Sequence, residues 1–384
     1  MGLYVHLPFC LRKCRYCDFC STPQHDDALR AHYVERLCDE LTARASEVNG
    51  RTVDTVYFGG GTPTLLSPAL FDRLLGVAHD RLSIAPDAEI TVECNPATVD
   101  ARALSSLRSL GINRLSIGAQ SAVDSELRAL GRVHSFDDTV RTVRDARRAG
   151  FDNVSLDVMY GIPDQTRESF RTTLDAILAL EPEHVSAYSL IVEPGTPFFE
   201  QRDTLALPDE DTVCDMTADA LSLLRGAGYR RYEISNFARD GHVSRHNLHY
   251  WQLDDYLGLG IAAHSLCTLD RPRPDGAIAL RTQNGTDLAA YLSGADVREM
   301  EEELTLGALR DEYVMLRLRL ADGIDKSAFA ARFGQAFDGV YGEAAARFIA
   351  MGLLTDTPQR IAFTDAGFAV SNTVLSEILF HEIL

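Results

Sequence analysis

The chain has 384 residues, of which 46% are hydrophobic and 24% charged, a balance typical of globular proteins. Its formal net charge of −19 repels phosphate backbones and anionic surfaces, so we expect no nucleic acid partner. No apolar stretch approaches the roughly 18–20 residues that span a bilayer, and the N-terminus does not read as a signal peptide. We therefore expect a cytoplasmic protein with no integral membrane segment.

Short β-rich runs alternate with amphipathic helices over the first half of the chain. The predicted strands are Leu3–Leu7, Val53–Phe58, Glu89–Glu93, Arg114–Ile117, Asn153–Met159 and His184–Ile191. One predicted helix begins at Ser67-Pro68 and buries Leu70, Leu74 and Leu75; another spans Thr166–Leu180. This alternation predicts βαβ units with a parallel sheet, as either an open doubly wound sheet or a partial barrel. Ligands then bind at the carboxyl ends of the strands.

Beyond about residue 300 the alternation of strands and helices gives way to several helices followed by a hairpin. Helices are predicted over Leu304–Leu318, Lys326–Phe333 and Val340–Met351, followed by a hairpin near 352–364. Such an order is similar to a winged-helix module, and the acidic chain favours a packing or lid role over DNA binding. We predict three segments: residues 1–235, a connecting region over 236–300, and an α+β, winged-helix-like domain over 301–384.

Three cysteines near the start of the chain, Cys10, Cys14 and Cys17, have the spacing C-x3-C-x2-C. Eight cysteines in a cytosolic chain favour metal or redox chemistry over disulfides. Three thiolates can hold three corners of an iron–sulfur cluster and leave the fourth iron open to another ligand. Cys20 adds a fourth thiol; we interpret it as a non-ligand, or at most a transient one, because it would displace that ligand.

Glycines and polar residues follow successive predicted strands. Gly59–Thr62 lacks the patterns of nucleotide-phosphate loops, but its missing Cβ atoms let a ligand approach the backbone, and a plain tight turn is the alternative. Glu93 ends the third predicted strand, Gln120 follows the fourth and Asp157 lies in the fifth. Such groups suit ribose hydroxyls or an ammonium, or form a structural network. Arg132 either faces a ligand carboxylate or pairs with Asp157.

The cysteine motif with Tyr16 before its third cysteine, together with Gly-Gly-Gly-Thr-Pro at 59–63, closely resembles radical S-adenosylmethionine (SAM) proteins. More narrowly, it resembles the group of oxygen-independent coproporphyrinogen III oxidase and its relatives, from Tyr4 to the C-terminus. The resemblance implies a partial (β/α)6 TIM-type barrel and a [4Fe-4S] cluster whose open iron is chelated by SAM. In that group an electron from the cluster cleaves SAM to a 5′-deoxyadenosyl radical.

The same resemblance assigns residues to the cofactors. Cys10, Cys14 and Cys17 become the cluster ligands. The implied SAM pocket consists of Tyr4, Tyr16, Gly60, Gly61, Thr62, Glu93, Gln120, Arg132 and Asp157. The glycine backbone is expected to hold the methionine part of SAM, and the later polar residues the ribose and neighbouring groups.

The string H-N-x-x-Y-W at residues 246–251 resembles the signature of the heme chaperone branch of this group. Imidazole can bind heme iron and aromatic rings can cover the macrocycle, so His246 is the predicted heme ligand. The alternative is a core histidine in an aromatic cluster. His242, His246 and His249 also suggest zinc, but no further ligand completes a convincing set.

Three functions remain open on these grounds. The first is a heme chaperone that passes heme to acceptor proteins, such as respiratory hemoproteins, and uses an electron donor. The second is coproporphyrinogen III oxidase, which the short segment before Cys10 and the presence of Phe19 where the oxidase has a further cysteine both disfavour. The third is a radical methyltransferase that uses a second SAM. No catalytic residue is assigned.

Overall fold

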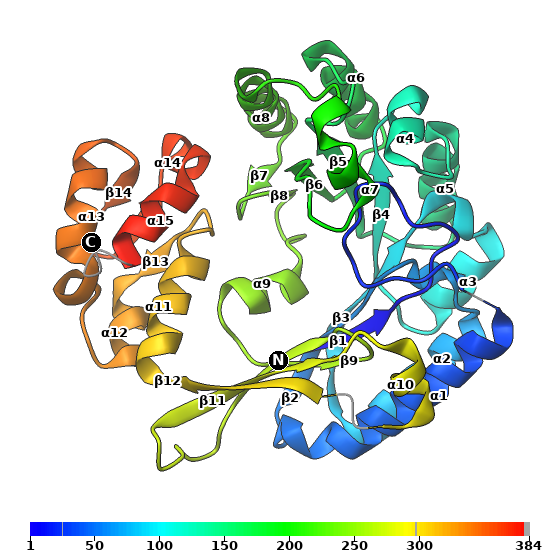
Figure 1. Ribbon diagram of the computed structural model, residues 1–384, viewed down its shortest axis with the longest axis horizontal. Coiled ribbons are helices and arrows are strands. Elements are labelled where there is room, and N and C mark those ends of the chain that lie inside the picture. Colours follow the sequence, from blue (N-terminus) through cyan, green and yellow to red (C-terminus); the bar gives the residue numbers. More distant parts are fainter. Residues whose placement is uncertain (25, 296–297, 380–384) are drawn as a thin grey trace.

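The computed structural model describes residues 1–24, 26–295 and 298–379, and within these ranges one twelve-stranded sheet runs through most of the chain (Figure 1). Its central strands are parallel and adjacent in chain order: β1 (Gly2–Leu7), β2 (Thr52–Gly60), β3 (Ser83–Cys94), β4 (Arg114–Gln120), β5 (Val154–Tyr160) and β6 (His184–Ser189). The connecting helices are α1 (Asp27–Arg44), α2 (Pro68–Arg81), α3 (Ala101–Ser109), α4 (Asp124–Leu130), α5 (Phe136–Arg148) and α6 (Arg167–Leu178). They lie along the outer side of the curved sheet (Figure 1), which confirms the predicted partial barrel.

The helix boundaries follow from local sequence. Thr166 caps α6: its side chain accepts from the Ser169 amide, and Ser169 bonds back to the cap in a capping box. Ser67 precedes α2 with Pro68 at the first position, as predicted, although the serine side chain makes no capping bond. On α2 the predicted Leu70 is only half-buried, because Phe71 takes the core position instead.

Both ends of the parallel sheet continue into antiparallel strands. Beyond β1 lie β9 (Tyr256–Leu259), β10 (His264–Thr268), β11 (Ala277–Asn284) and β12 (Arg298–Thr305), of which β9 is still parallel to β1. Beyond β6 lie β8 (Asn236–Ala238) and β7 (Arg230–Arg231). The remaining helices of this half are α7 (Pro197–Glu200), α8 (Glu210–Gly226), α9 (Arg245–Trp251) and α10 (Leu288–Ser293).

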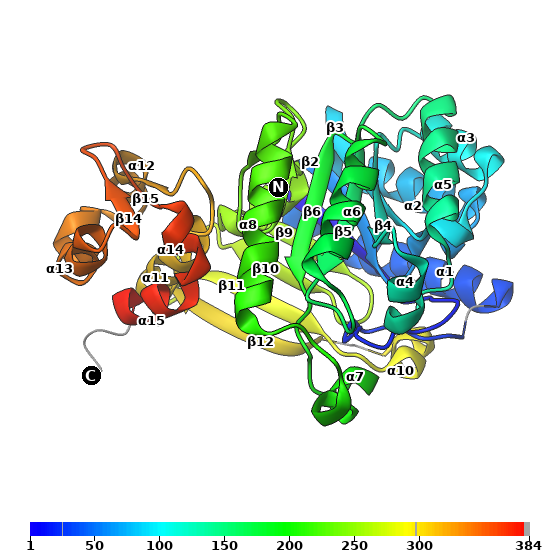
Figure 2. The same ribbon diagram turned by 90° about the horizontal axis from the view of Figure 1, so that it is seen from above.

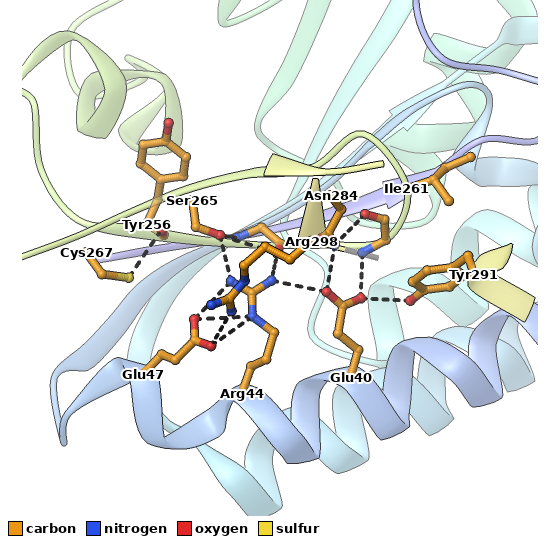
Figure 3. A network of polar contacts seen from close by, with 12 residues as sticks. Glu40, Arg44, Glu47, Tyr256, Ile261, Ser265, Cys267, Asn284, Tyr291 and Arg298 are labelled. Atoms are coloured by element: carbon orange, nitrogen blue, oxygen red, sulfur yellow. Dashed lines mark hydrogen bonds and ion pairs between the residues drawn. The ribbon is translucent and has the colours of Figure 1, made fainter. Parts of the chain in front are cut away.

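A polar network joins α1 to the strands added beyond β1 (Figure 3). The guanidinium of Arg44 donates to the Gly258 carbonyl at 2.8 Å and to Ser265 Oγ at 3.0 Å. Glu40 accepts from the Gly260 amide and from the Tyr291 hydroxyl, both at 2.8 Å. Since Arg44 is buried and also pairs with Glu40, these bonds fix the extension against the barrel.

The C-terminal segment has a hydrophobic core of its own, which also takes in side chains from β10, β11 and β12. It contains α11 (Leu306–Arg317), α12 (Lys326–Phe333), α13 (Phe337–Ala350), α14 (Asp365–Ala369) and α15 (Ser371–Leu379). A small sheet combines β13 (Ile324–Asp325), β15 (Arg360–Phe363) and β14 (Leu354–Asp356). The predicted helices and hairpin are confirmed, and the domain stands apart from the barrel in Figure 2. Its last five residues, 380–384, lie outside the described ranges, and the predicted segment boundaries stay predictions.

In the part of the chain that the structure describes, every helix is too short or too polar to cross a membrane.

Candidate functional site

A cavity of about 390 Å³ opens at the carboxyl ends of the parallel strands. It brings together eleven of the residues predicted from the sequence: Cys10, Cys14, Tyr16, Cys17, Gly60, Gly61, Thr62, Glu93, Gln120, Arg132 and Asp157. These residues come from the loop after β1, from β2 to β5 and from the turn after α4. Two predicted residues, Tyr4 and His246, do not line the cavity.

The loop that carries the cysteines is held in place by backbone hydrogen bonds. The Thr22 amide donates to the Pro8 carbonyl at 2.7 Å, and the Cys10 amide donates to the Thr22 carbonyl at 2.9 Å. Farther along, the Arg15 amide donates to the Leu130 carbonyl at the end of α4 at 3.0 Å. The loop is therefore tied to itself and to the opposite side of the cavity without using its thiols.

Tyr4 contacts this loop through His6. The His6 Nε2 lies 2.7 Å from the Cys20 carbonyl, which can only accept, so Nε2 carries the proton. Nδ1 then accepts from the Tyr4 hydroxyl at 3.0 Å, and burial lowers the pKa of His6, which keeps the ring neutral. The Cys20 thiol itself lies 4.0 Å from the Thr286 carbonyl, outside the cavity lining.

The three thiols of the motif have polar neighbours in the cavity wall. The Thr62 hydroxyl donates to Cys10 Sγ, and Arg132 Nη1 donates to Cys14 Sγ, both at 3.7 Å. Burial raises the pKa of Cys10 and Cys17, to about 11 for Cys17, so metal binding at these thiols must release protons. No three His, Cys, Asp or Glu side chains of the described residues converge on a site for one ion. A cluster does not need that, because each thiolate binds a different iron.

Glycines line the cavity where backbone and loop approach closely. Gly60 has φ of +111°, and a Cβ there would lie 2.5 Å from the His6 ring. A Cβ on Gly61 would lie 2.7 Å from the Phe9 carbonyl oxygen. Gly118 is equally constrained, since a Cβ would lie 2.9 Å from Gln120 Nε2. Any side chain at these positions would push the cysteine loop or a polar residue out of place.

Glu93 presents a carboxylate that has two neutral donors and, among the described residues, no ion pair within 4.0 Å. Tyr57 donates its hydroxyl to Oε1 at 2.9 Å, and the Gly60 amide donates to Oε2 at 3.1 Å. Burial raises the pKa of Glu93 from 4.5 to about 7. An ammonium group in the cavity would relieve that desolvation and keep the carboxylate charged.

The other polar residues are aligned by side chains from other strands of the sheet. The Ser116 hydroxyl lies 3.3 Å from both oxygens of Asp157, whose pKa is also raised by burial. The Tyr188 hydroxyl donates to Gln120 Oε1 at 2.8 Å, and Gln120 holds a φ of +63°, unusual for a side chain of its size. The sequence does not predict Tyr57, Ser116 or Tyr188. Each of them hydrogen-bonds a residue that the sequence does predict for the pocket.

Two buried polar atoms at the cavity have no partner among the described residues, Arg132 Nε and Asn95 Oδ1. Arg132 does not pair with Asp157; it donates to the Gly118 carbonyl at 2.8 Å and to Cys14. Unpaired buried polar atoms are uncommon in folded proteins, and a bound ligand or water would supply the missing partner. Thiols, a glycine cradle, a carboxylate and an arginine together fit an iron–sulfur cluster with a small zwitterion against it.

The second motif lies on α9, away from this cavity. His246 is 1% exposed; its Nδ1 lies 2.8 Å from Thr55 Oγ1 and its Nε2 lies 2.9 Å from the Tyr250 hydroxyl. The ring stacks on Tyr57, and burial lowers its pKa to about 3. Both nitrogens are thus engaged, so iron could bind only after the tyrosine hydroxyl moves. The role of His246 as a heme ligand stays a prediction.

Comparisons with known proteins cover nearly the whole chain. The Radical SAM superfamily model matches residues 4–177, and the HemN C-terminal domain model matches residues 304–370. The heme chaperone HemW of Escherichia coli K12 is 36% identical over 381 residues, which cover 99% of this chain and 98% of that protein. HemW of Bacillus subtilis 168 is 34% identical over 379 residues, covering 98% of each.

Among solved structures, the coproporphyrinogen III oxidase HemN from Escherichia coli, described as a radical SAM enzyme, matches 99% of this chain and 90% of its own with a TM-score of 0.84. Sequence identity in that alignment is 25%. The identities to the HemW proteins are higher and extend over nearly the full length of both chains. The chain therefore belongs to the heme chaperone HemW family within the radical SAM superfamily.

Proposed function

We propose that this chain is a heme chaperone that holds a [4Fe-4S] cluster and SAM in the cavity and passes heme to acceptor hemoproteins. The observation that carries the proposal is the convergence of three thiols and eight predicted SAM residues on one cavity. Similarity over nearly the full length to proteins named heme chaperones supports the proposed transfer of heme.

In this proposal Cys10, Cys14 and Cys17 bind the cluster as thiolates. When bound, the cluster supplies an electron for SAM chemistry. The backbone at Gly60–Thr62 leaves room for the methionine part of SAM, and Glu93 accepts hydrogen bonds from its ammonium group. Tyr16, Gln120, Arg132 and Asp157 surround the rest of the molecule. Tyr4 acts from outside the cavity, through His6 and the loop.

Heme is the proposed cargo, and α9 with its H-N-x-x-Y-W string is the proposed binding element. His246 binds heme iron once its Nε2 exchanges the Tyr250 hydroxyl for the metal. An electron donor would serve the cluster, and acceptor hemoproteins, respiratory ones among them, would receive the heme. We place the process in the cytoplasm.

An anaerobic reconstitution tests the proposal. The protein is loaded with iron and sulfide, then mixed with SAM, reductant and either heme or coproporphyrinogen III. We expect a Soret band on heme addition that His246→Ala weakens, and no new porphyrin product. Formation of protoporphyrinogen would instead establish the oxidase, and methylation of an added substrate would establish the methyltransferase.

A further inference from the structure

A second cleft, of about 500 Å³, lies where the β7–β8 edge of the sheet meets α9 and the C-terminal domain. Its walls hold five arginines: Arg230, Arg231, Arg239, Arg317 and Arg360. Two aspartates, Asp240 and Asp322, also line it, which leaves three positive charges in excess. The whole chain carries a net charge of −19, so a positively charged cleft is a local exception to its overall field.

Two of the five arginines are neutralised by carboxylates. Arg230 pairs with Asp240 at 2.5 Å, and Arg231 pairs with Asp365 at 2.7 Å. Asp365 lies at the start of α14, so this second pair also ties the β7 edge to the C-terminal domain. Arg231, whose side chain is buried, is therefore structural, whereas the exposed pair of Arg230 with Asp240 only offsets a charge.

The other three keep some donors available for a ligand, although the Arg239 guanidinium lies 5.0 Å from the centre of the Tyr229 ring and Arg360 Nη1 donates to the Asp322 carbonyl at 3.1 Å. Among the described residues, no carboxylate lies within 4.0 Å of Arg239 or Arg317. Arg317 donates one Nη2 bond to the Gly323 carbonyl at 3.0 Å, and its Nε is buried without a partner. Arg360 has carboxylate oxygens only at 3.8 and 4.0 Å, beyond the range of a good hydrogen bond. Guanidinium groups without a close carboxylate partner can bind the carboxylates of a ligand in bidentate geometry.

The remaining lining of the cleft is partly apolar and includes the motif-bearing helix. Leu248 of α9 and Gln252, the residue that caps its C-terminal end, face the cleft, with Tyr232 and Val243 beside them. His246, two residues before Leu248, lies on the other side of α9, where it contacts Thr55 of β2. Figure 1 shows α9 between the barrel and the C-terminal helices. A flat apolar ligand with carboxylates at one edge matches this combination of walls.

We propose that heme docks in this cleft through its two propionates, which Arg239, Arg317 and Arg360 bind, on the face of α9 opposite His246. The proposal rests on the proposed function, since it names where the cargo first binds. Heme docked there is not yet a ligand of His246. Docking and iron ligation are therefore separate events on the two faces of one helix.

Heme and its dimethyl ester, which lacks the carboxylates, distinguish this docking from general apolar binding. Both are titrated into the cluster-loaded wild type, Arg239→Gln, Arg317→Gln and the double variant. Loss of each charged hydrogen bond should weaken heme binding about tenfold. The ester should bind the wild type and the variants alike. Arg317→Lys, which keeps the charge, should retain most of the affinity.

Arg128→Gln on α4, an exposed arginine far from the C-terminal domain, is the matched control and should bind heme as the wild type does. Circular dichroism confirms that each variant is folded. Heme affinity equal to wild type in the double variant would overturn the proposal. An equal loss for heme and ester would also overturn it, because carboxylates would then play no part. Failure of the wild type itself to bind heme would instead refute the proposed function.

Discussion

The cluster cavity and the α9 motif differ in how far their polar groups are already satisfied. In the cavity, Arg132 Nε and Asn95 Oδ1 are buried without a partner among the described residues, and burial raises the pKa of Glu93 to about 7. At α9, both nitrogens of His246 are hydrogen-bonded, and His249 lies between Asp54 and Asp254 at 2.9 and 3.3 Å. The cavity keeps unpaired polar groups, whereas the α9 motif pairs its polar groups with its own side chains.

This difference indicates two modes of binding. A cavity whose unpaired groups are already fixed loses little conformational freedom when a ligand enters. A closed histidine network must first break its internal hydrogen bonds, so its ligand selects a minor conformation. We therefore expect the cluster and SAM to bind a preformed site, and heme ligation at His246 to depend on a rearrangement of α9.

The largest expected effect is the loss of the cluster in Cys14→Ser. A serine hydroxyl is a poor substitute for a thiolate ligand to iron. After anaerobic reconstitution, iron content and visible absorption should fall at least about tenfold, since even the loss of a residue that only supports a metal ligand costs at least about that much. Cys20→Ser is the matched control and should retain the wild-type content, because Cys20 does not line the cavity. A loss of equal size in the Cys20 variant would make Cys20 a ligand.

The sequence allowed the parallel strands, the first-half helices and most of the cavity lining to be predicted. Period-two and helical patterns report which face of an element is buried, and parallel strands place their carboxyl ends together. Gly118, in contrast, looks like any strand glycine until the Gln120 and Arg132 side chains are in place around it. The antiparallel additions at both sheet edges were not predicted either, since their pairing depends on tertiary contacts such as the Arg44 network.

The sequence left two states of His246 open, a heme ligand and a core histidine in an aromatic cluster. The string H-N-x-x-Y-W places a tyrosine four residues after the histidine, on the same face of a helix. That spacing fits a shared ligand pocket and an internal hydrogen bond equally well. Only the position of Thr55 on β2, nearly two hundred residues earlier in the chain, shows that the ring is enclosed from both sides.

His246→Ala tests the hydrogen-bonded α9 motif and should destabilise the protein by about 3 kcal/mol. The change removes a buried ring and leaves the hydroxyls of Thr55 and Tyr250 without a hydrogen-bond partner. The free-energy cost of the cavity therefore adds to the cost of the unpaired hydroxyls. Urea unfolding of the heme-free protein measures the loss. His242→Ala, on a more exposed ring, is the control and should cost less than about 0.5 kcal/mol. Equal stability of the His246 variant and the wild type would show that the network adds nothing to folding.

Glu93→Gln tests the cluster cavity. We expect SAM affinity to fall ten- to a hundredfold, because a charged hydrogen bond contributes about 1.5–3 kcal/mol. Equilibrium binding of SAM to the cluster-loaded protein measures this loss of affinity.

In the ligand-free wild type, the folded pKa of Glu93, about 7, exceeds the unfolded value of 4.5, so stability falls as pH rises through that window. The glutamine variant has no such penalty, and its stability relative to wild type should increase between pH 5 and pH 8 by roughly 3 kcal/mol. A pH-independent difference would contradict the raised pKa.

Tyr250→Phe should produce the smallest change and separates the two roles of His246. Loss of the hydroxyl leaves Nε2 buried without its partner, which should cost about 1 kcal/mol in urea unfolding. The same loss removes the competitor that iron must displace. Heme should therefore bind the phenylalanine variant at least as tightly as the wild type, with an unchanged Soret band, whereas His246→Ala weakens that band. A parallel loss of the band in both variants would mean that the hydroxyl and the imidazole act together, and that α9 opens as a unit.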